Sequence, residues 1–112
     1  MKSRTAARLL PRLKKICLAL PEAGVKLTWG NPTFFARRQA FAVLDHYEGH
    51  DCLVLKPRSA ALKKKLLADP RYFDPPYVGK KGWIALKLDA GSTDWGLVEA
   101  LVHESYQKML FP

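Results

Sequence analysis

Two histidines stand at a spacing that some metal sites use. His46 and His50 are four residues apart, and three acids lie beside them in the sequence: Asp45, Glu48 and Asp51. On a helix, a spacing of four would place both imidazoles on one face. Gly49 between them instead indicates a turn, so a solvated hairpin loop is expected. We therefore predict no metal site and no intrinsic cofactor.

The candidate nucleophiles lack the partners that covalent catalysis needs. Cys52 follows His50 by two residues, which would place both on one face of a strand, but no third group orients the histidine. Ser105 has no Gly-x-Ser-x-Gly elbow around it, and its hydroxyl is expected to bond to the carbonyl of Leu101. Cys17 and Cys52 match no metal spacing and are expected to be reduced core residues, which favours a cytoplasmic protein. No catalytic residue is predicted, and an enzyme is the least favoured hypothesis.

Positive charge is the strongest chemical signal in the chain. Its 112 residues include 19 Lys and Arg against 10 Asp and Glu, and the formal net charge is +9. The excess lies in residues 1–81, which carry 17 basic and 6 acidic side chains. Such a field attracts polyanions. Hydrophobic residues make up 48% of the chain and charged residues 26%, the balance of a globular protein, so residues 1–112 are expected to form a single domain.

Eight cations occupy predicted loops, strand ends and one helix: Arg37, Arg38, Lys56, Arg58, Lys64, Lys65, Lys80 and Lys81. The two arginines at 37 and 38 lie at a predicted hairpin tip, and basic tips can act as wings along a phosphate backbone. Lys80 and Lys81 lie between Gly79 and Gly82, without the spacing of a P-loop. We expect these lysines to meet DNA phosphates rather than base edges, with a solvated turn as the alternative. The aromatic residues of the strands are expected to be core rather than stacking platforms.

Hydrophobic periodicity predicts the elements that position these cations. Apolar steps of three and four predict helices, and alternation predicts strands. The predicted helices cover residues 5–20, residues 59–68 with Ser59 as N-cap, and a last helix capped by Ser92 or Thr93; the predicted strands cover 25–29, 33–37, 40–45, 52–56 and 83–88. Pro11 is expected near the start of the regular part of the first helix, and residues 70–82 are expected to be loop. The order α-β-β-β-β-α-β-α indicates an α+β fold, an antiparallel sheet with helices mainly on one face.

One hydrophobic core is expected in this fold, with contributions from six residues: Leu20, Trp29, Phe41, Leu53, Trp83 and Val102. The longest apolar runs, 41–44 and 84–86, fall far short of the ~20 residues of a membrane span, so no membrane partner is expected. The N-terminal stretch is basic and has no acid before Glu22, as in a transit peptide. Its apolar stripe also fits an ordinary first helix, which we prefer.

Several short motifs resemble, in their order, the MmcQ/YjbR family. The chain has Leu20-Pro21 at the end of its first helix, Trp29-Gly30-Asn31-Pro32-Thr33-Phe34 at a turn, Gly79-Lys80-Lys81-Gly82-Trp83 before a strand, and Ser105-Tyr106 in its last helix. The resemblance implies an α+β fold like that of the frataxin/CyaY group and a role as a double-wing DNA-binding protein. Gln39-Ala40 stands where the family's hairpins often carry Gly-Lys, so that lysine is absent and only Arg37 or Arg38 could replace its charge.

Two hypotheses of different class follow. The first is a non-enzymatic protein that binds duplex DNA through sequence-tolerant contacts to the phosphate backbone. The alternative is a protein-interaction or small-anion-binding domain whose basic surface is incidental. Neither hypothesis specifies an oligomeric state.

Overall fold

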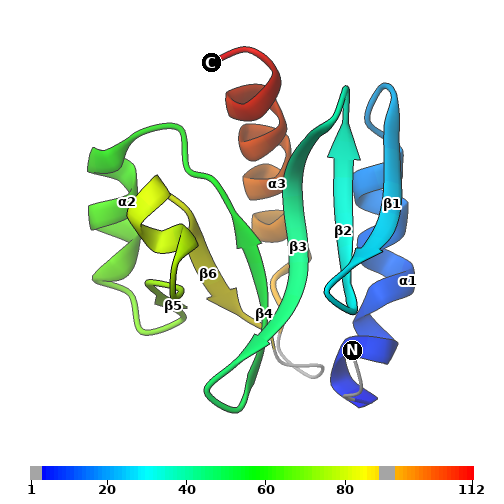
Figure 1. Ribbon diagram of the computed structural model, residues 1–112. Helices are drawn as coiled ribbons and strands as arrows, with labels where there is room; N and C mark the ends of the chain where they lie inside the picture. The colour runs from blue at the N-terminus through cyan, green and yellow to red at the C-terminus, as the bar shows by residue number, and fades with distance from the viewer. Residues whose placement is uncertain (1–3, 89–92) are drawn as a thin grey trace.

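The structure is a computed structural model that describes residues 4–88 and 93–112. Within these ranges the chain forms, in order, α1 (Arg4–Leu18), β1 (Ala23–Thr28), β2 (Asn31–Ala36), β3 (Gln39–Tyr47), β4 (His50–Leu55), α2 (Ala60–Leu67), β5 (Tyr72–Phe73), the 3₁₀ helix η1 (Val78–Lys81), β6 (Ile84–Lys87) and α3 (Trp95–Leu110). The strands pair antiparallel in the order β1-β2-β3-β4-β6-β5 (Figure 1). The predicted α+β class and antiparallel sheet are confirmed.

The main core lies between the sheet and the helices α1 and α3, which cover the same face of it (Figure 1). Buried residues recur along α1 as Leu9, Leu13 and Cys17, a step of four that keeps one stripe against the sheet. This stripe continues through Pro11, so the helix begins well before the proline, contrary to the prediction. The proline side chain is exposed, on the solvent side of the helix. Packing of the residues before and after Pro11 against the sheet therefore stabilises the helix by more than the interior proline destabilises it.

Three two-residue turns connect the first four strands. The last paired residues are Thr28 with Asn31, Ala36 with Gln39, and Tyr47 with His50. All six turn residues have positive φ: Trp29, Gly30, Arg37, Arg38, Glu48 and Gly49. Positive φ at both positions is the requirement of the type I′ turn, whose twist matches that of the strands. The turns therefore fix the register, and β3 and β4 extend further toward their turn than the predicted strands did.

The face of the sheet without α1 and α3 carries a second, smaller apolar cluster. Its buried members are Cys52, Val54 and Ala85, with Trp83 partly buried against them. The prediction of one core is wrong for Trp83, because Ile84 points into the main core and neighbouring strand residues face opposite sides. It is also wrong for Trp29, which is 98% exposed at a turn. For the other four residues the prediction is confirmed: Leu20, Phe41, Leu53 and Val102 belong to or pack against the main core.

The segment predicted as loop, residues 70–82, contains β5 and η1. A strand of two residues is too short to show alternation, and the prolines around it favour a loop prediction.

Of the predicted helix caps, the cap of α2 is confirmed and the cap of α3 is formed by another residue. Ser59 accepts a bond from the Leu62 N–H as predicted (3.1 Å), whereas Asp94 rather than Thr93 caps α3 through the Leu97 N–H (3.1 Å). Ser92 lies outside the described residues.

Ser105 links α3 to two strands. Its buried hydroxyl donates to the carbonyl of Phe41 on β3 (2.6 Å) and accepts from the N–H of Lys56 after β4 (2.9 Å). The predicted bond to Leu101 within the helix is therefore wrong. The hydroxyl instead satisfies a backbone carbonyl and a backbone N–H where β3 and β4 meet α3.

Both cysteines are buried and free, as the sequence predicted for core residues. Burial raises the pKa of Cys17 to about 12 and that of Cys52 to about 12. Because the thiolate is the reactive form, neither residue is expected to react with a maleimide at pH 8 while the protein is folded. Mass spectrometry after labelling should find no adduct in buffer and two in denaturant. Rapid labelling of either cysteine in buffer would contradict the packing described.

Candidate functional site

A groove crosses the face of the sheet opposite α1 and α3. One part, of about 380 Å³, runs from the β1–β2 turn over β3 and β4 to η1. A second part, of about 490 Å³, shares Thr28, Thr33 and Ala40 with the first and continues to the β2–β3 turn. We call the two parts together the open-face groove. Its lining residues are Lys26, Thr28, Trp29, Asn31, Thr33, Phe35, Arg38, Ala40, Val43, Asp45, Tyr47, Val54, Val78, Lys81 and Trp83.

Strand register explains the floor of the open-face groove. Thr33 pairs with Val43, and Val43 pairs with Val54, so these side chains form a row across three strands. The residues next to them in sequence, such as Phe34 and Leu44, face the main core. In this row, alternation places the larger side chains under the helices and the smaller Thr33, Val43 and Val54 on the other face. The small side chains leave the sheet hollowed at its centre.

Aromatic side chains border the groove at its η1 end and at the β1–β2 turn. Trp29 and Tyr77 are 98% and 88% exposed, whereas Tyr47 and Trp83 are partly buried. Burial, with the neighbouring Asp45 carboxylate, raises the pKa of Tyr47 to about 12. A phenol is protonated in neutral solution even without this shift, and the Tyr47 hydroxyl already interacts with the Asp45 carboxylate. Tyr77 lies near enough to contribute to the same pKa shift.

Cations stand at both ends of the open-face groove. Lys81 lines it on η1, and Lys26 and Arg38 line it at the opposite end. The ammonium of Lys26 also lies 5.2 Å from the centre of the Phe35 ring. Asp45 is the one carboxylate among the described residues that line the groove. The groove is therefore positive at its ends and aromatic along part of its border.

The structure brings together half of the eight cations that the sequence singled out. Arg38 and Lys81 line the groove, Lys80 is exposed beside Lys81 on η1, and the stem of Lys56 lies against Gly82. Lys64 and Lys65 are exposed on α2 and do not line the groove.

Arg37 and Arg58 are engaged by acids elsewhere in the structure. The Arg37 guanidinium bonds to Glu22, which raises its pKa, and it lies over the Phe111 ring. Arg58 bonds to the Glu104 carboxylate on α3 (3.2 Å). Their partners lie 15 and 46 residues away in the chain. Such distant pairs cannot be inferred from local spacing.

The η1 segment is anchored by Lys63 of α2, which was not among the eight cations that the sequence singled out. Its ammonium donates to the Asp74 carboxylate (2.8 Å) and to the carbonyl of Gly79 (2.7 Å), and its side chain is only 13% exposed. A side chain at Gly79 would displace the Asp74 carboxylate from the position in which it accepts the bond from Lys63. Lys63 therefore ties α2 to the segment that carries Lys80 and Lys81.

Lys63→Met is expected to destabilise the protein by about 1–2 kcal/mol, because two charge-assisted hydrogen bonds disappear while the aliphatic stem remains. Urea unfolding measures this destabilisation, and native-state hydrogen exchange should quicken at Gly82, whose N–H bonds to Gly79. Lys64→Met, at the exposed neighbouring position, is the matched control and should change neither quantity. Equal effects of the two variants would show that Lys63 does not anchor η1.

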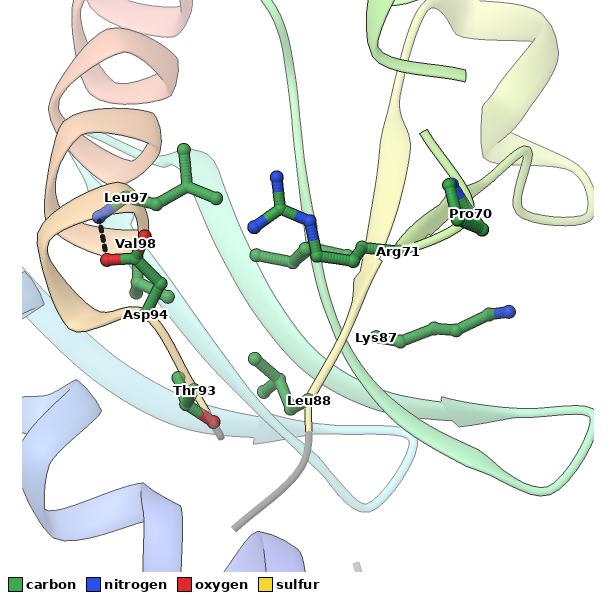
Figure 2. A pocket seen from close by; sticks show the side chains of 9 residues that line it. Pro70, Arg71, Lys87, Leu88, Thr93, Asp94, Leu97 and Val98 are labelled. Atoms are coloured by element: carbon green, nitrogen blue, oxygen red, sulfur yellow. Dashed lines mark hydrogen bonds between the residues drawn. The ribbon is translucent and has the colours of Figure 1, made fainter. Parts of the chain in front are cut away.

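A second cavity, of about 310 Å³, lies between β6 and the start of α3 (Figure 2). Two of its charged groups have other partners. The Arg71 guanidinium bonds to the Asp69 carboxylate (2.7 Å), and Asp94 caps α3 through the Leu97 N–H. Figure 2 shows Leu97 and Val98 on the helix side of the cavity and Leu88 at the end of β6. This cavity therefore offers less chemistry than the open-face groove.

The predicted histidine hairpin does not form a metal centre in the part of the chain described. His46 Nδ1 lies 2.9 Å from the Asp51 carboxylate, and Asp51 is buried on β4 rather than solvated in a turn. No group of three or more His, Cys, Asp or Glu residues within 4–88 and 93–112 is arranged to hold a metal ion. None of the described helices is long and apolar enough to cross a membrane.

These features define a class: a basic α+β protein whose helices leave one face of an antiparallel sheet open, with tight turns and a cationic 3₁₀ segment around it. Within that class, the family model for YjbR matches residues 18–108, and the chain belongs to the YjbR family. The resemblance seen in the sequence is thereby confirmed. No curated protein matches the chain.

Proposed function

We propose that this protein binds DNA through the open-face groove, by contacts to the phosphate backbone that tolerate any sequence. The observation that carries the proposal is the placement of Lys26 and Arg38 at one end of the groove and Lys81 at the other. A polyanion lying along the groove would meet positive charge at each end. Such contacts release counterions and carry no sequence information.

The same geometry favours phosphates over base edges as the groups contacted. Reading of base edges in the major groove usually uses an α-helix or a two-stranded ribbon inserted there. Here α1 and α3 pack on the opposite face of the sheet (Figure 1). The sheet presents a shallow hollow instead. The proposal includes no catalytic step. It also places the protein in the cytoplasm, where free cysteines stay reduced.

Duplex affinity measured at three salt concentrations tests the proposal. For two unrelated sequences, log K should fall linearly with log salt, by about 0.9 for each phosphate contact, and the two lines should coincide. Absence of salt-dependent binding would remove the proposal. A strong preference for one of the two sequences would show that the protein recognises bases and would contradict binding through the phosphate backbone alone.

The second candidate function is a protein-interaction or small-anion-binding domain. It is favoured by the exposure of large apolar side chains, because aromatic residues are enriched where proteins bind each other. Trp29 and Tyr77 are such residues beside the groove. This alternative predicts no salt-dependent affinity for DNA, so the same titration separates the two functions.

A further inference from the structure

Trp29 occupies a position that the fold does not explain. It is 98% exposed, and its φ of 54° places it in the left-handed region, at the first position of a two-residue turn. Asn, Asp and Gly are favoured there, because a bulky side chain is strained at positive φ. Burial of the indole does not offset this strain. Charged residues occupy the same position in the β2–β3 and β3–β4 turns, but at Trp29 the turn exposes a large aromatic side chain whose apolar surface folding does not use.

Tyr77 repeats this pattern at the η1 end. Its φ of 64° and ψ of −66° form a γ-turn with positive φ, closed by the Val78 N–H on the Pro76 carbonyl (2.7 Å). This is the rarer and more strained form of γ-turn. The ring is 88% exposed, and the next residue, Val78, lines the open-face groove. Trp29 thus lines the open-face groove, and Tyr77 is the neighbour in sequence of a residue that lines it.

We infer that the open-face groove holds an unpaired stretch of DNA, whose bases stack on Trp29 and Tyr77 while its phosphates meet the cations at the ends. The inference rests on the proposed DNA binding and names single strands as the form of DNA that binds more tightly than duplex. In a duplex the faces of each base are stacked on the neighbouring base pairs, so exposed aromatic rings of the protein find few base faces on which to stack. In a single strand every base offers a free π-face, and stacking of this kind tolerates sequence.

The charge and shape of the groove agree with that occupant. Lys81 at one end and Lys26 with Arg38 at the other complement a chain of phosphates. The small side chains of Thr33 and Ala40 leave room over the sheet between the two ends. A groove that combines cations with exposed aromatic rings is the arrangement by which single strands are bound without sequence preference.

The test uses the full chain and three probes of one length: single-stranded DNA, duplex DNA, and an abasic strand that has the phosphates without the bases. The single strand should bind more tightly than the other two and should quench tryptophan emission. Trp29→Asn should weaken single-strand binding roughly tenfold or more and remove most of the quenching. It should leave affinity for the abasic strand unchanged.

Two variants serve as controls. Leu27→Ala removes another exposed apolar side chain (71% exposed) from the opposite face of β1 and should change nothing. Tyr77→Phe should bind like the parent, whereas Tyr77→Ala should bind the single strand more weakly. Asparagine is favoured at the turn position of Trp29, so Trp29→Asn is expected to fold, and thermal melting checks this.

The outcomes separate this inference from the function on which it rests. Equal affinity for the three probes, with no effect of Trp29→Asn, would overturn base stacking and leave phosphate binding standing. A loss of duplex affinity alone in Trp29→Asn would show insertion into the duplex and would also overturn it. Absence of salt-dependent binding to every probe would overturn both.

Discussion

Replacing Lys80 and Lys81 together by alanine should weaken duplex DNA binding by roughly tenfold and about equally for unrelated sequences. Lys81 lines the open-face groove and Lys80 is exposed beside it on η1. The slope of log K against log salt should also flatten by about 0.9 for each phosphate that the variant no longer neutralises. The fold should survive, because both side chains are exposed. The measurement is duplex affinity at three salt concentrations for the parent and the variant.

A matched control separates local contacts from overall charge. Lys14→Ala with Lys15→Ala removes the same charge from exposed positions on α1, across the sheet from the groove. This control should keep most of the affinity and the original slope. Equal decreases in affinity for the two double variants would mean that net charge, not the η1 segment, drives binding. Unchanged binding in the Lys80 and Lys81 variant would remove η1 from the interface.

Ser105→Ala is expected to lower the free energy of unfolding by about 2–4 kcal/mol, because the Phe41 carbonyl and the Lys56 N–H are both left without their partner in a buried site. This is a large share of the roughly 5–15 kcal/mol that stabilises a typical domain. Urea unfolding followed by circular dichroism measures it. The cations that line the groove, Lys26, Arg38 and Lys81, make no bond with Ser105, so affinity per folded molecule should not change.

Ser59→Ala provides the comparison for Ser105→Ala. Ser59 accepts one bond from the Leu62 N–H at the exposed start of α2, and loss of such a cap costs about 1 kcal/mol. If Ser105→Ala costs no more than Ser59→Ala, the buried hydroxyl does not stabilise the junction of α3 with β3 and β4 in the way described.

Local signals were sufficient for most of the fold. Short turns between alternating segments predict a meander, and it forms; helical stripes predict α1 and α3, and both form. Trp29 shows where such signals fail. Its hydrophobicity predicts burial, but the turn consists of Trp29 and Gly30 rather than of the residues from Gly30 to Pro32, which places the indole at a tip. Apolar character alone does not distinguish the last residue of a strand from the first residue of a turn.

The candidate site was less predictable, because charge density in the sequence does not show which cations are already paired. Lys63, Lys64 and Lys65 cannot be distinguished by residue type, yet among them Lys63 is the one shown to bond to Asp74 and to the Gly79 carbonyl of η1. Lys26 and Arg38 become neighbours of one groove only through the pairing of β1, β2 and β3. The aromatic border was missed for a different reason: aromatic residues in strands are usually core, and the exposed ones lie in turns.

The anchoring of η1 by Lys63 also has a thermodynamic consequence for any ligand that meets Lys80 and Lys81. A disordered loop gives up conformational entropy when it binds, at about 1–2 kcal/mol for each residue whose backbone becomes fixed. Here the backbone is fixed during folding, by the bonds from Lys63 to Gly79 and Asp74. Only the freedom of the two lysine side chains remains to be restricted on binding. A side chain that need not touch the ligand thereby lowers the entropic cost of the contacts made by its neighbours.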